Sequence, residues 1–430
     1  MTSILFEVSE ARATSAAGFD EVFLWNETAT STFQGPLKPS LTQLGQVQPL
    51  NSDFVRIALA VLAADRSVLR ARGGSEWNRR QFDLTVAVDH PDVWVGQAIH
   101  LAQVVGFLTG DTWSFTFDQA APLPTHTPAS ALENTSRVVL LSGGADSATG
   151  ALMSRHNLSE GEGHILISQF SQHAIAGVQE ALAAQIERLV PGRGQTHHRI
   201  QLTRKSERFD GTRFKDERST RSRSILFLAL GLAAASVTDT PLRIPENGFA
   251  SLNPPLGPER RGSLSTKTTH PKFLNDLRQL LTDIGAHGDI VNPYEQMTKG
   301  EMFRDLADTF GDDAASTYLS KTNSCSHADG RFAGISPGSS CGVCFGCLVR
   351  RASFHAAGLV DRTTYLSDDK TGKSADYVKG KSIEVAMRDF VSAGVSNAMI
   401  MAMDLPDGYS ARDAHALCVR GVAELAEFLK

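Results

Sequence analysis

The stretch from Arg137 to Met153, RVVLLSGGADSATGALM, constrains the fold more than any other part of the chain. An apolar run typical of a buried strand enters a loop of small residues, and an Ala-rich helical pattern follows it. Because Gly143 and Gly144 have no Cβ atom, backbone N–H groups in the loop can approach an anion closely. The stretch therefore predicts a strand, a phosphate-binding loop and a helix in succession. A plain Gly-Gly turn without a ligand is the alternative interpretation.

Apolar runs and helical patterns continue to alternate after this loop. Asp146 or Ser147 is placed to cap the first helix, whose N-terminus would offer further N–H donors and a positive dipole end. The alternation predicts an α/β fold in which helices cover a parallel sheet, and such sheets bind ligands at the carboxyl ends of their strands. The expected strands are 137–141, 164–170 and 241–247, and the expected helices are 147–156, 175–189 and 222–235.

The first part of the chain has a different pattern. Residues 82–88 and 113–117 alternate between apolar and polar side chains, as half-buried strands do, and residues 53–70 have apolar side chains at helical spacing. We expect an α+β domain there, followed by a linker that contains several prolines. The predicted division is 1–120 for the N-terminal domain, 121–136 for the linker, 137–320 for the α/β core, 321–361 for a cysteine-rich segment and 362–430 for a helical segment.

Composition argues against several classes of protein. The 430 residues are 41% hydrophobic and 21% charged, as in an ordinary globular protein of two or three domains. The formal net charge of −5 argues against a broadly basic surface for nucleic acid. No apolar run is long enough to span a bilayer, and the N-terminus MTSILFEVSEARAT lacks the pattern of a secretory signal, so we expect a cytoplasmic protein.

Four of the five cysteines are grouped in the sequence. Cys325, Cys341, Cys344 and Cys347 have the spacing C-x15-C-x2-C-x2-C. Four thiolates suit a tetrahedral Zn²⁺ ion, and a site closed by four cysteines would be structural. An iron–sulfur cluster uses the same donors and is one alternative, and four unliganded thiols are another. Cys418 stands apart on a predicted helix, where we expect it to be buried core.

The loop LLSGGADS resembles the SGGxDS loop of the PP-loop ATP pyrophosphatases, which cleave ATP between its α and β phosphates. The resemblance implies that the loop holds the pyrophosphate, with Mg²⁺ present, and that Asp146 and Ser147 are catalytic. It also implies activation of a carboxylate as an acyl-adenylate, from which AMP is a good leaving group for a nitrogen nucleophile. The residues implied to bind the nucleotide in this loop are Ser142, Gly143, Gly144, Asp146 and Ser147.

The cysteine segment narrows this resemblance. NSCSHADG…SSCGVCFGCLVRRASFHAAGL is similar to the zinc segment SCY…CGxCxxCxxRxxxFxxAG of the 7-cyano-7-deazaguanine synthase family. Three shorter pieces follow the same order. FSQH would make Gln172 a nucleotide ligand, and RSRSILFLALGLAAA would place Arg223 near the nucleotide. MTKGEM would make Lys299 a phosphate ligand and a catalytic residue. The resemblance covers roughly residues 137–361 and implies Zn²⁺ at the four cysteines.

The chain also departs from that family. Gln169 stands where the family has an acidic residue, and the segment PENGFASLNPPLGPERRGSLSTKTTHPKF differs where the acceptor should bind. The extended layout resembles synthase-like proteins of Qat-type bacterial antiphage defence operons. That resemblance implies activation of a 7-carboxy-7-deazaguanine-like molecule and transfer to an amine of a partner protein. Nitrile formation on a small molecule, a tRNA-modifying thiolase and a nucleotide-responsive scaffold remain alternatives, and the oligomeric state is open.

Charged residues outside the motifs suggest further contacts. The segment 204–223 is rich in Lys and Arg. It is either a solvated loop or an arm that closes over the triphosphate with Arg218, Arg221 or Arg223. His270, which precedes a proline in a polar stretch, is either a plain loop residue or an aid to the acceptor.

Overall fold

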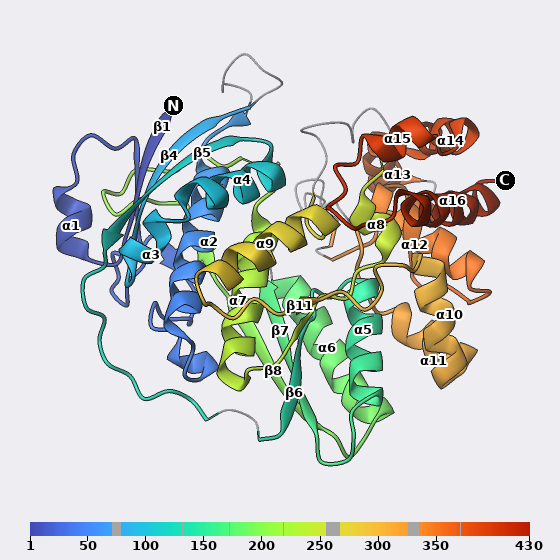
Figure 1. Ribbon diagram of the computed structural model, residues 1–430. Helices are drawn as coiled ribbons and strands as arrows, with labels where there is room; N and C mark the ends of the chain where they lie inside the picture. Colours follow the sequence, from blue (N-terminus) through green and yellow to red (C-terminus); the bar gives the residue numbers. More distant parts are fainter. Residues whose placement is uncertain are drawn as a thin grey trace. The chain divides into compact units, whose positions relative to one another are not determined.

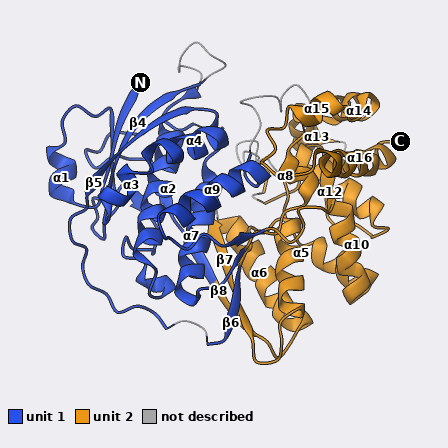
Figure 2. Cartoon of the chain, in the orientation of Figure 1, with its two compact units in different colours: residues 1–138, 198–242, 262–291 blue, residues 139–197, 243–261, 292–430 orange. Residues whose placement is uncertain are grey.

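The structure is a computed structural model that describes residues 1–70, 79–130, 133–171, 173–217, 219–254, 267–325, 335–336, 338–369 and 371–430. Two of the predicted residues, Gln172 and Arg218, lie outside the described residues. The chain divides into two compact units, each made of three segments (Figure 2). Unit 1 comprises residues 1–138, 198–242 and 262–291, and unit 2 comprises residues 139–197, 243–261 and 292–430.

Unit 1 contains a four-stranded sheet with the order β2-β1-β4-β5. Three of its strands, β1, β4 and β5, are labelled in Figure 1. Its strand pairs are all parallel, and Leu84 lies opposite Phe115. The alternation predicted for 82–88 is confirmed, because Phe82, Leu84 and Val86 are buried. The parallel pairing refines the expected α+β domain to an arrangement in which strands and helices alternate. The strands are β1 (Thr2–Glu7), β2 (Glu21–Leu24), β4 (Gln81–Val88) and β5 (Thr112–Gln119).

Helices and a short antiparallel pair complete unit 1. The helical pattern at 53–70 is confirmed as α2, which packs against α7. A 3-10 turn, η1, covers Thr42–Leu44, and β3 (Phe33–Gln34) pairs with β9 (Thr203–Arg204). The helices are α1 (Glu10–Ser15), α2 (Pro49–Ser67), α3 (Pro91–Val95), α4 (Ala98–Thr109), α7 (Arg223–Thr238) and α9 (Pro271–Asp283).

A buried carboxylate, Asp65 of α2, anchors the start of α7 within unit 1. Its Oδ2 accepts hydrogen bonds from the backbone nitrogens of Arg221 and Ser222 at 2.7 and 3.0 Å. Its Oδ1 pairs with Arg70 and Arg80. Burial acts against ionisation, but the positive charge of Arg80 outweighs it, and the pKa of Asp65 is lowered. Arg221 is itself buried, whereas most described residues from 205 to 217 are exposed or partly exposed, so only the end of this basic segment is packed.

The second sheet has the strand order β11-β10-β6-β7-β8. Three of its strands lie where the apolar runs predict them, although β10 is shorter than expected. The sequence did not indicate β8, because GQTHHRIQ is polar. A strand at the end of the order faces water more than a central one and tolerates such residues. The strands are β6 (Thr135–Leu140), β7 (Gly163–Phe170), β8 (Gly194–Gln201), β10 (Leu242–Arg243) and β11 (Ile290–Val291).

Within the described residues, helices of unit 2 contribute to two large apolar clusters and to a smaller one around the cysteines. In one, α5, α10, α11 and α12 bury residues such as Phe303, Tyr318 and Phe354. In the other, the C-terminal helices pack with α8 and α12, and the predicted helical C-terminus is confirmed. The helices are α5 (Ala145–His156), α6 (His173–Leu189), α8 (Gly248–Leu252), α10 (Lys299–Phe310), α11 (Asp312–Leu319), α12 (Phe345–Ala356), α13 (Gly372–Lys379), α14 (Glu384–Ala393), α15 (Asn397–Met401) and α16 (Ala411–Phe428), with a 3-10 turn η6 at Leu366–Asp368.

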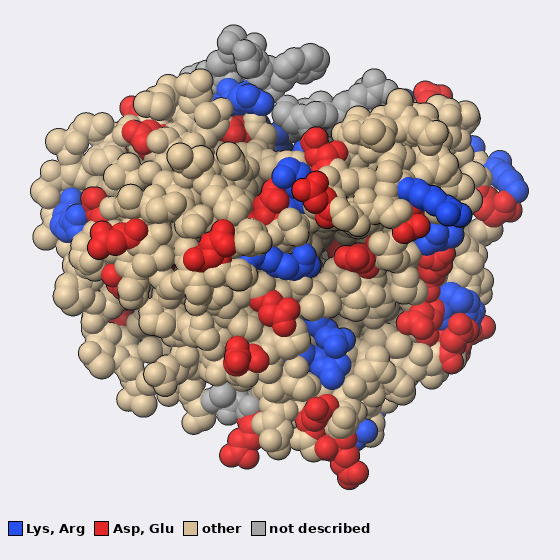
Figure 3. Space-filling view, viewed as in Figure 1, with Lys and Arg blue, Asp and Glu red and all other residues tan. Residues whose placement is uncertain are grey.

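The visible surface carries both signs of charge. On the face drawn in Figure 3, basic and acidic side chains are interspersed, and neither sign forms a continuous field. This face therefore lacks the basic stripe that nucleic-acid binding requires. Within the described part of the chain, no helix has the length and apolar character needed to cross a membrane.

Candidate functional site

The predicted phosphate loop joins β6 to α5 in unit 2. Gly143 has a φ of 93°, a left-handed conformation that favours glycine. The two serines of the loop brace it, because Ser142 N donates to Ser147 Oγ at 3.1 Å and the two hydroxyl oxygens lie 2.9 Å apart. Gly144 N donates to Ser142 Oγ at 3.3 Å. The predicted strand, loop and helix are therefore present, with the serine hydroxyls on the inside of the turn.

The expectation that Asp146 or Ser147 caps α5 was wrong. The residue before the helix is Gly144, which makes no side-chain capping bond, and α5 begins at Ala145. Asp146 and Ser147 lie within the first turn, where Ser147 Oγ donates to the Gly144 carbonyl at 3.0 Å. A capping side chain must stand on an extended residue that precedes the helix, and these two come too late. Asp146 is consequently available for other partners.

Asp146 lies at the centre of a buried group of polar side chains. Its Oδ1 is 3.1 Å from Lys299 Nζ, and its Oδ2 accepts a hydrogen bond from Asn247 Nδ2 at 2.8 Å. Glu246 also forms a side-chain hydrogen bond to Asp146. The structure thus brings together residues from α5, from the turn before α8 and from the start of α10. Two of them, Asp146 and Lys299, are sequence-predicted site residues.

The protonation states in this group follow from burial and charge. Burial acts to raise the pKa of Asp146, but the positive charge of Lys299 and the hydrogen bonds outweigh it, so its pKa lies below the usual value. Burial, reinforced by the negative charge of Asp146, raises the pKa of Glu246 well above its usual value. A raised pKa favours the protonated form of Glu246, which can donate a hydrogen bond to the Asp146 carboxylate.

Sequence reasoning missed Glu246. Its position depends on a close approach between α5 and the turn before α8, which Gly150 permits. A Cβ atom at Gly150 would lie 2.1 Å from Pro245 Cβ. Asn292 holds the same turn, because its Nδ2 donates to the Glu246 carbonyl at 2.9 Å. Asn247 caps α8 by accepting from Ala250 N at 2.8 Å. The only local signal was the cap residue in PEN, which does not reveal the carboxylate beside it.

Lys299 is presented by the first turn of α10. Thr298 is the N-cap, and it forms a capping box with Glu301. The Lys299 side chain is 11% exposed, so it lies mostly inside the protein and faces Asp146. A largely buried cation that pairs with Asp146, next to a loop of backbone N–H groups, is suited to receive a phosphate oxygen.

The remaining predicted residues have separate positions. Arg223 is the first residue of α7 in unit 1 and is exposed, and its role at a nucleotide stays a prediction. His270 is buried at the N-cap of α9, where its Nδ1 accepts from Lys272 N at 3.2 Å. A capping role explains His270 without an acceptor.

A short segment connects the predicted phosphate loop to the cysteines. Asn323 N donates to the Gly143 carbonyl at 2.9 Å, and Asn323 Oδ1 accepts from Cys325 N at 2.9 Å. Ala145 N donates to Ser324 Oγ at 3.4 Å. The first cysteine is therefore tied by its neighbours to the loop at the start of α5.

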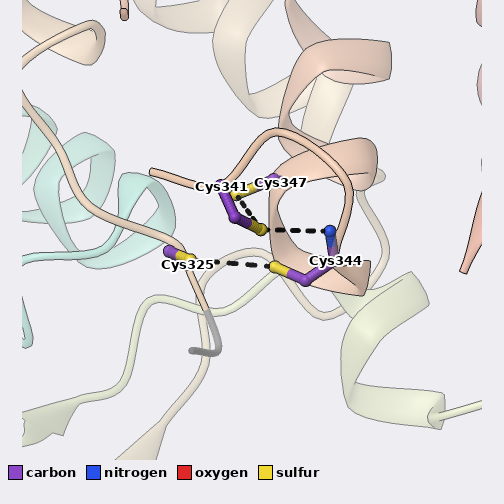
Figure 4. A group of neighbouring side chains, drawn as sticks. All are labelled: Cys325, Cys341, Cys344 and Cys347. Atoms are coloured by element: carbon purple, nitrogen blue, oxygen red, sulfur yellow. Dashed lines mark hydrogen bonds between the residues drawn. The ribbon is translucent and has the colours of Figure 1, made fainter. Parts of the chain in front are cut away.

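The four cysteines converge, as predicted from their spacing (Figure 4). Their sulfur atoms all lie within 4.8 Å of one another, with 3.9 Å between Cys325 and Cys344 and between Cys341 and Cys347. Metal–sulfur bonds of ~2.3 Å in a tetrahedron require sulfur separations of about 3.8 Å, so the donor set fits a metal ion. Gly342, at a φ of 86°, turns the chain so that Cys344 N donates to Cys341 Sγ at 3.3 Å.

Cys418 differs from this group. It is fully buried on α16 among apolar side chains, as predicted. Burial raises the pKa of its thiol to about 12, so the residue is part of the core and is not a reactive thiol.

Comparison with known proteins gives the family. No protein-family model matches the chain. A 7-cyano-7-deazaguanine synthase from Cupriavidus necator is 31% identical over 250 residues, which are 53% of this chain and 96% of the relative. This chain belongs to the 7-cyano-7-deazaguanine synthase family. Synthases of that name from Dechloromonas aromatica and Ralstonia nicotianae are 29% and 30% identical over 247 and 249 residues. Each match again covers 53% of this chain and 97% of the relative, so this member of the family carries a large additional part.

Proposed function

We propose that this protein is an ATP-dependent enzyme that activates the carboxylate of a 7-carboxy-7-deazaguanine-like molecule. A carboxylate oxygen attacks the α-phosphorus of ATP, and the bond to the β-phosphate oxygen breaks to release pyrophosphate. A nitrogen nucleophile then attacks the acyl carbon of the adenylate, and AMP leaves. The observation that carries this proposal is the Asp146–Lys299 pair beside the SGGADS loop, in a chain whose relatives are named 7-cyano-7-deazaguanine synthases.

In this proposal, the loop and the buried polar group bind different parts of the Mg-ATP complex. The backbone N–H groups of Gly143 and Gly144 and the hydroxyls of Ser142 and Ser147 bind the departing pyrophosphate. Lys299 neutralises charge that develops on the phosphates, and Asp146 supplies a carboxylate for the Mg²⁺ that accompanies ATP. The further nucleotide ligands in this proposal are Gln172 and Arg223.

The four cysteines hold Zn²⁺ as a structural ion. A set of four thiolates leaves no open position for substrate, and three of the four cysteines are fully buried. The ion fixes the segment whose residues Asn323 and Ser324 contact the phosphate loop. An iron–sulfur cluster is the alternative occupant.

The nucleophile is the amine of a partner protein, and the system is a Qat-type antiphage defence operon. The support is the resemblance of the extended layout to that group, together with the large part of the chain that the relatives do not match. The second candidate function is nitrile formation on the small molecule, which the printed name of the relatives favours. The two differ in which nitrogen attacks. Nitrile formation also needs a second step, in which the amide oxygen attacks another ATP, pyrophosphate is released, and the oxygen then leaves with AMP as the nitrile forms.

One assay separates these functions. The purified protein is incubated with Mg-ATP and 7-carboxy-7-deazaguanine, with ammonia or with a protein encoded beside it, and AMP, pyrophosphate and intact masses are measured. We expect AMP and pyrophosphate in the wild type, loss of both in Lys299→Met, and retention in Lys321→Met, a change at an exposed lysine. Mass added to the protein partner supports amide transfer, and a nitrile product supports the second candidate. If the protein binds ATP but forms no AMP with ammonia or with the neighbouring protein, both candidate functions are contradicted. A nucleotide-responsive scaffold is then the function that remains.

A further inference from the structure

The C-terminal helix α16 binds the turn that presents Lys299. The Glu424 carboxylate accepts hydrogen bonds from Thr298 Oγ1 and, at 3.2 Å, from Gly300 N. These two residues flank Lys299 in the chain. A Cβ atom at position 300 would lie 2.5 Å from Glu424 Oε1, so glycine is what allows the carboxylate to approach the backbone. Glu424 thus occupies the amino end of α10, where a negative charge also complements the helix dipole.

A second side chain of α16 binds the same segment. Arg420 Nε donates to Glu301 Oε1 at 2.7 Å, and its Nη2 donates to the Gln296 carbonyl at 2.7 Å. Arg420 and Glu424 are one helical turn apart and therefore lie on one face of α16. Together they hold both sides of the Thr298–Glu301 capping box. The position of Lys299 is consequently set by contacts from α16 as well as by its own helix.

The same helix also supports the other side of the buried polar group. Gly421 lets α16 contact α8, because a Cβ atom there would lie 2.4 Å from Phe249 Cγ. A Cβ atom at Gly248, which follows Asn247, would likewise lie 2.7 Å from Leu417 Cδ2. In Figure 1, α16 lies beside α8 and α12, and α10 is adjacent. One helix therefore braces both segments that supply partners to Asp146.

The surroundings of Glu424 make its ionisation state sensitive to pH near neutrality. Burial raises the pKa of Glu424 to about 7, although the bonds from Thr298 and Gly300 act in the opposite direction. The charged residues of α10 that face it are Lys299 and Glu301, and Arg420 is the neighbour on its own helix. On the α12 side, the ring of His355 contacts Phe428, and Ala356 lies against Gly300. Helix α8 adds no charged side chain near Glu424, because its sequence, GFASL, contains no charged residue.

We propose that Glu424 is a positioning residue that orients Lys299 for the phosphates, so that the C-terminal helix α16 completes the ATP site. This inference rests on the proposed function. The motifs shared with the family end near residue 361, so the brace comes from the additional part of the chain. Ionised Glu424 accepts from both of its donors, whereas the protonated acid loses an acceptor and loosens the start of α10. ATP affinity should then depend on the state of a residue that does not touch ATP.

The test compares Glu424→Gln with the wild type and with Glu427→Gln. Glu427 lies on the same helix with a side chain that is 55% exposed, and it serves as the matched control. The Kd for Mg-ATP is measured by calorimetry at pH 6 and pH 8, together with thermal unfolding. We expect Glu424→Gln to weaken binding about tenfold at pH 8, as for loss of a charge-assisted hydrogen bond, and to approach the wild type at pH 6. Taking the ratio of the two affinities cancels the titration of ATP.

The unfolding temperature separates positioning from structure. Because folding raises the pKa of Glu424, its ionised form costs stability at pH 8, and the Gln variant should unfold at no lower a temperature than the wild type. If the Kd of Glu424→Gln divided by that of the wild type is near one at pH 8, the inference is overturned. A Kd ratio that does not change with pH and accompanies a loss of stability also overturns it. If Glu424→Gln does not fold, Arg420→Met removes the second contact and should weaken binding severalfold; unchanged binding overturns the inference. A wild type that binds no Mg-ATP instead rejects the proposed function, on which the inference rests.

Discussion

Lys299 Nζ lies 3.1 Å from Asp146 Oδ1, although the two residues belong to helices far apart in the chain. Each charge is largely removed from water, and each compensates the other. In the proposed function, a phosphate group that enters the loop replaces Asp146 as the partner of Lys299, and the carboxylate then becomes available to a divalent cation. The pair therefore keeps two charged groups ready in the absence of ligand.

Replacing Lys299 with Met should affect both stability and activity. Asp146 would remain buried without its cation, so the free energy of unfolding should fall by about 3 kcal/mol. Pyrophosphate release should fall at least roughly a hundredfold, because a charge that stabilises the phosphates is removed. Urea denaturation and a pyrophosphate assay measure the two effects. Lys321→Met should change neither, and equal activity of the two variants would contradict the assigned role.

Replacing Glu246 with Gln should change the dependence of stability on pH. Folding raises the pKa of Glu246 above its ordinary value of 4.5, so the folded protein binds more protons than the unfolded chain. The contribution of Glu246 is thus complete below about pH 4.5 and is lost as the pH rises toward the raised value. Gln keeps the hydrogen bond to Asp146 and cannot ionise. We expect wild-type melting temperatures to fall relative to Glu246→Gln between pH 5 and pH 9, and parallel curves would contradict the protonated state.

Replacing Gly150 with Ala should separate α5 from the turn that carries Glu246. The new methyl group would overlap Pro245, and overpacking of this kind costs about 1–3 kcal/mol. ATP affinity should fall with it, because Glu246 and Asn247 would move away from Asp146. Gly177→Ala in α6 is the control, since a Cβ atom there meets nothing within 4 Å. That change should stabilise the protein by roughly 0.5–1 kcal/mol. Thermal unfolding of both variants tests whether Gly150→Ala lowers the stability and Gly177→Ala raises it.

Removing the metal ligands should destabilise unit 2. We expect one zinc ion per chain by elemental analysis and loss of that ion in Cys344→Ser. Binding of structural zinc contributes on the order of 10 kcal/mol in isolated peptides, so a strong chelator should lower the unfolding temperature markedly. Cys418→Ala should retain the ion, because Cys418 belongs to the α16 core. Iron with sulfide in place of zinc would establish the alternative cluster.

Local patterns were sufficient for the parts of the site that are contiguous in sequence. The apolar run, the two glycines and the helical pattern between Arg137 and Met153 predicted β6, the loop and α5, because strand and helix periodicity and glycine conformation depend on near neighbours. The cysteine spacing likewise predicted a convergent group, since two of its intervals are short turns. The motif MTKGEM marked Lys299, although it did not say which carboxylate the lysine would meet.

Only the tertiary structure placed Glu246 beside Asp146 and Glu424 at the start of α10. Neither carboxylate has a local signature, because what distinguishes it is burial against a distant segment. The raised pKa values of these two residues have the same origin, since desolvation is a property of the packed site and not of the residue type. The chain therefore encodes its glycine-rich loop and its cysteine group locally, whereas packing of α5, α8, α10 and α16 decides which charged side chains lie beside that loop.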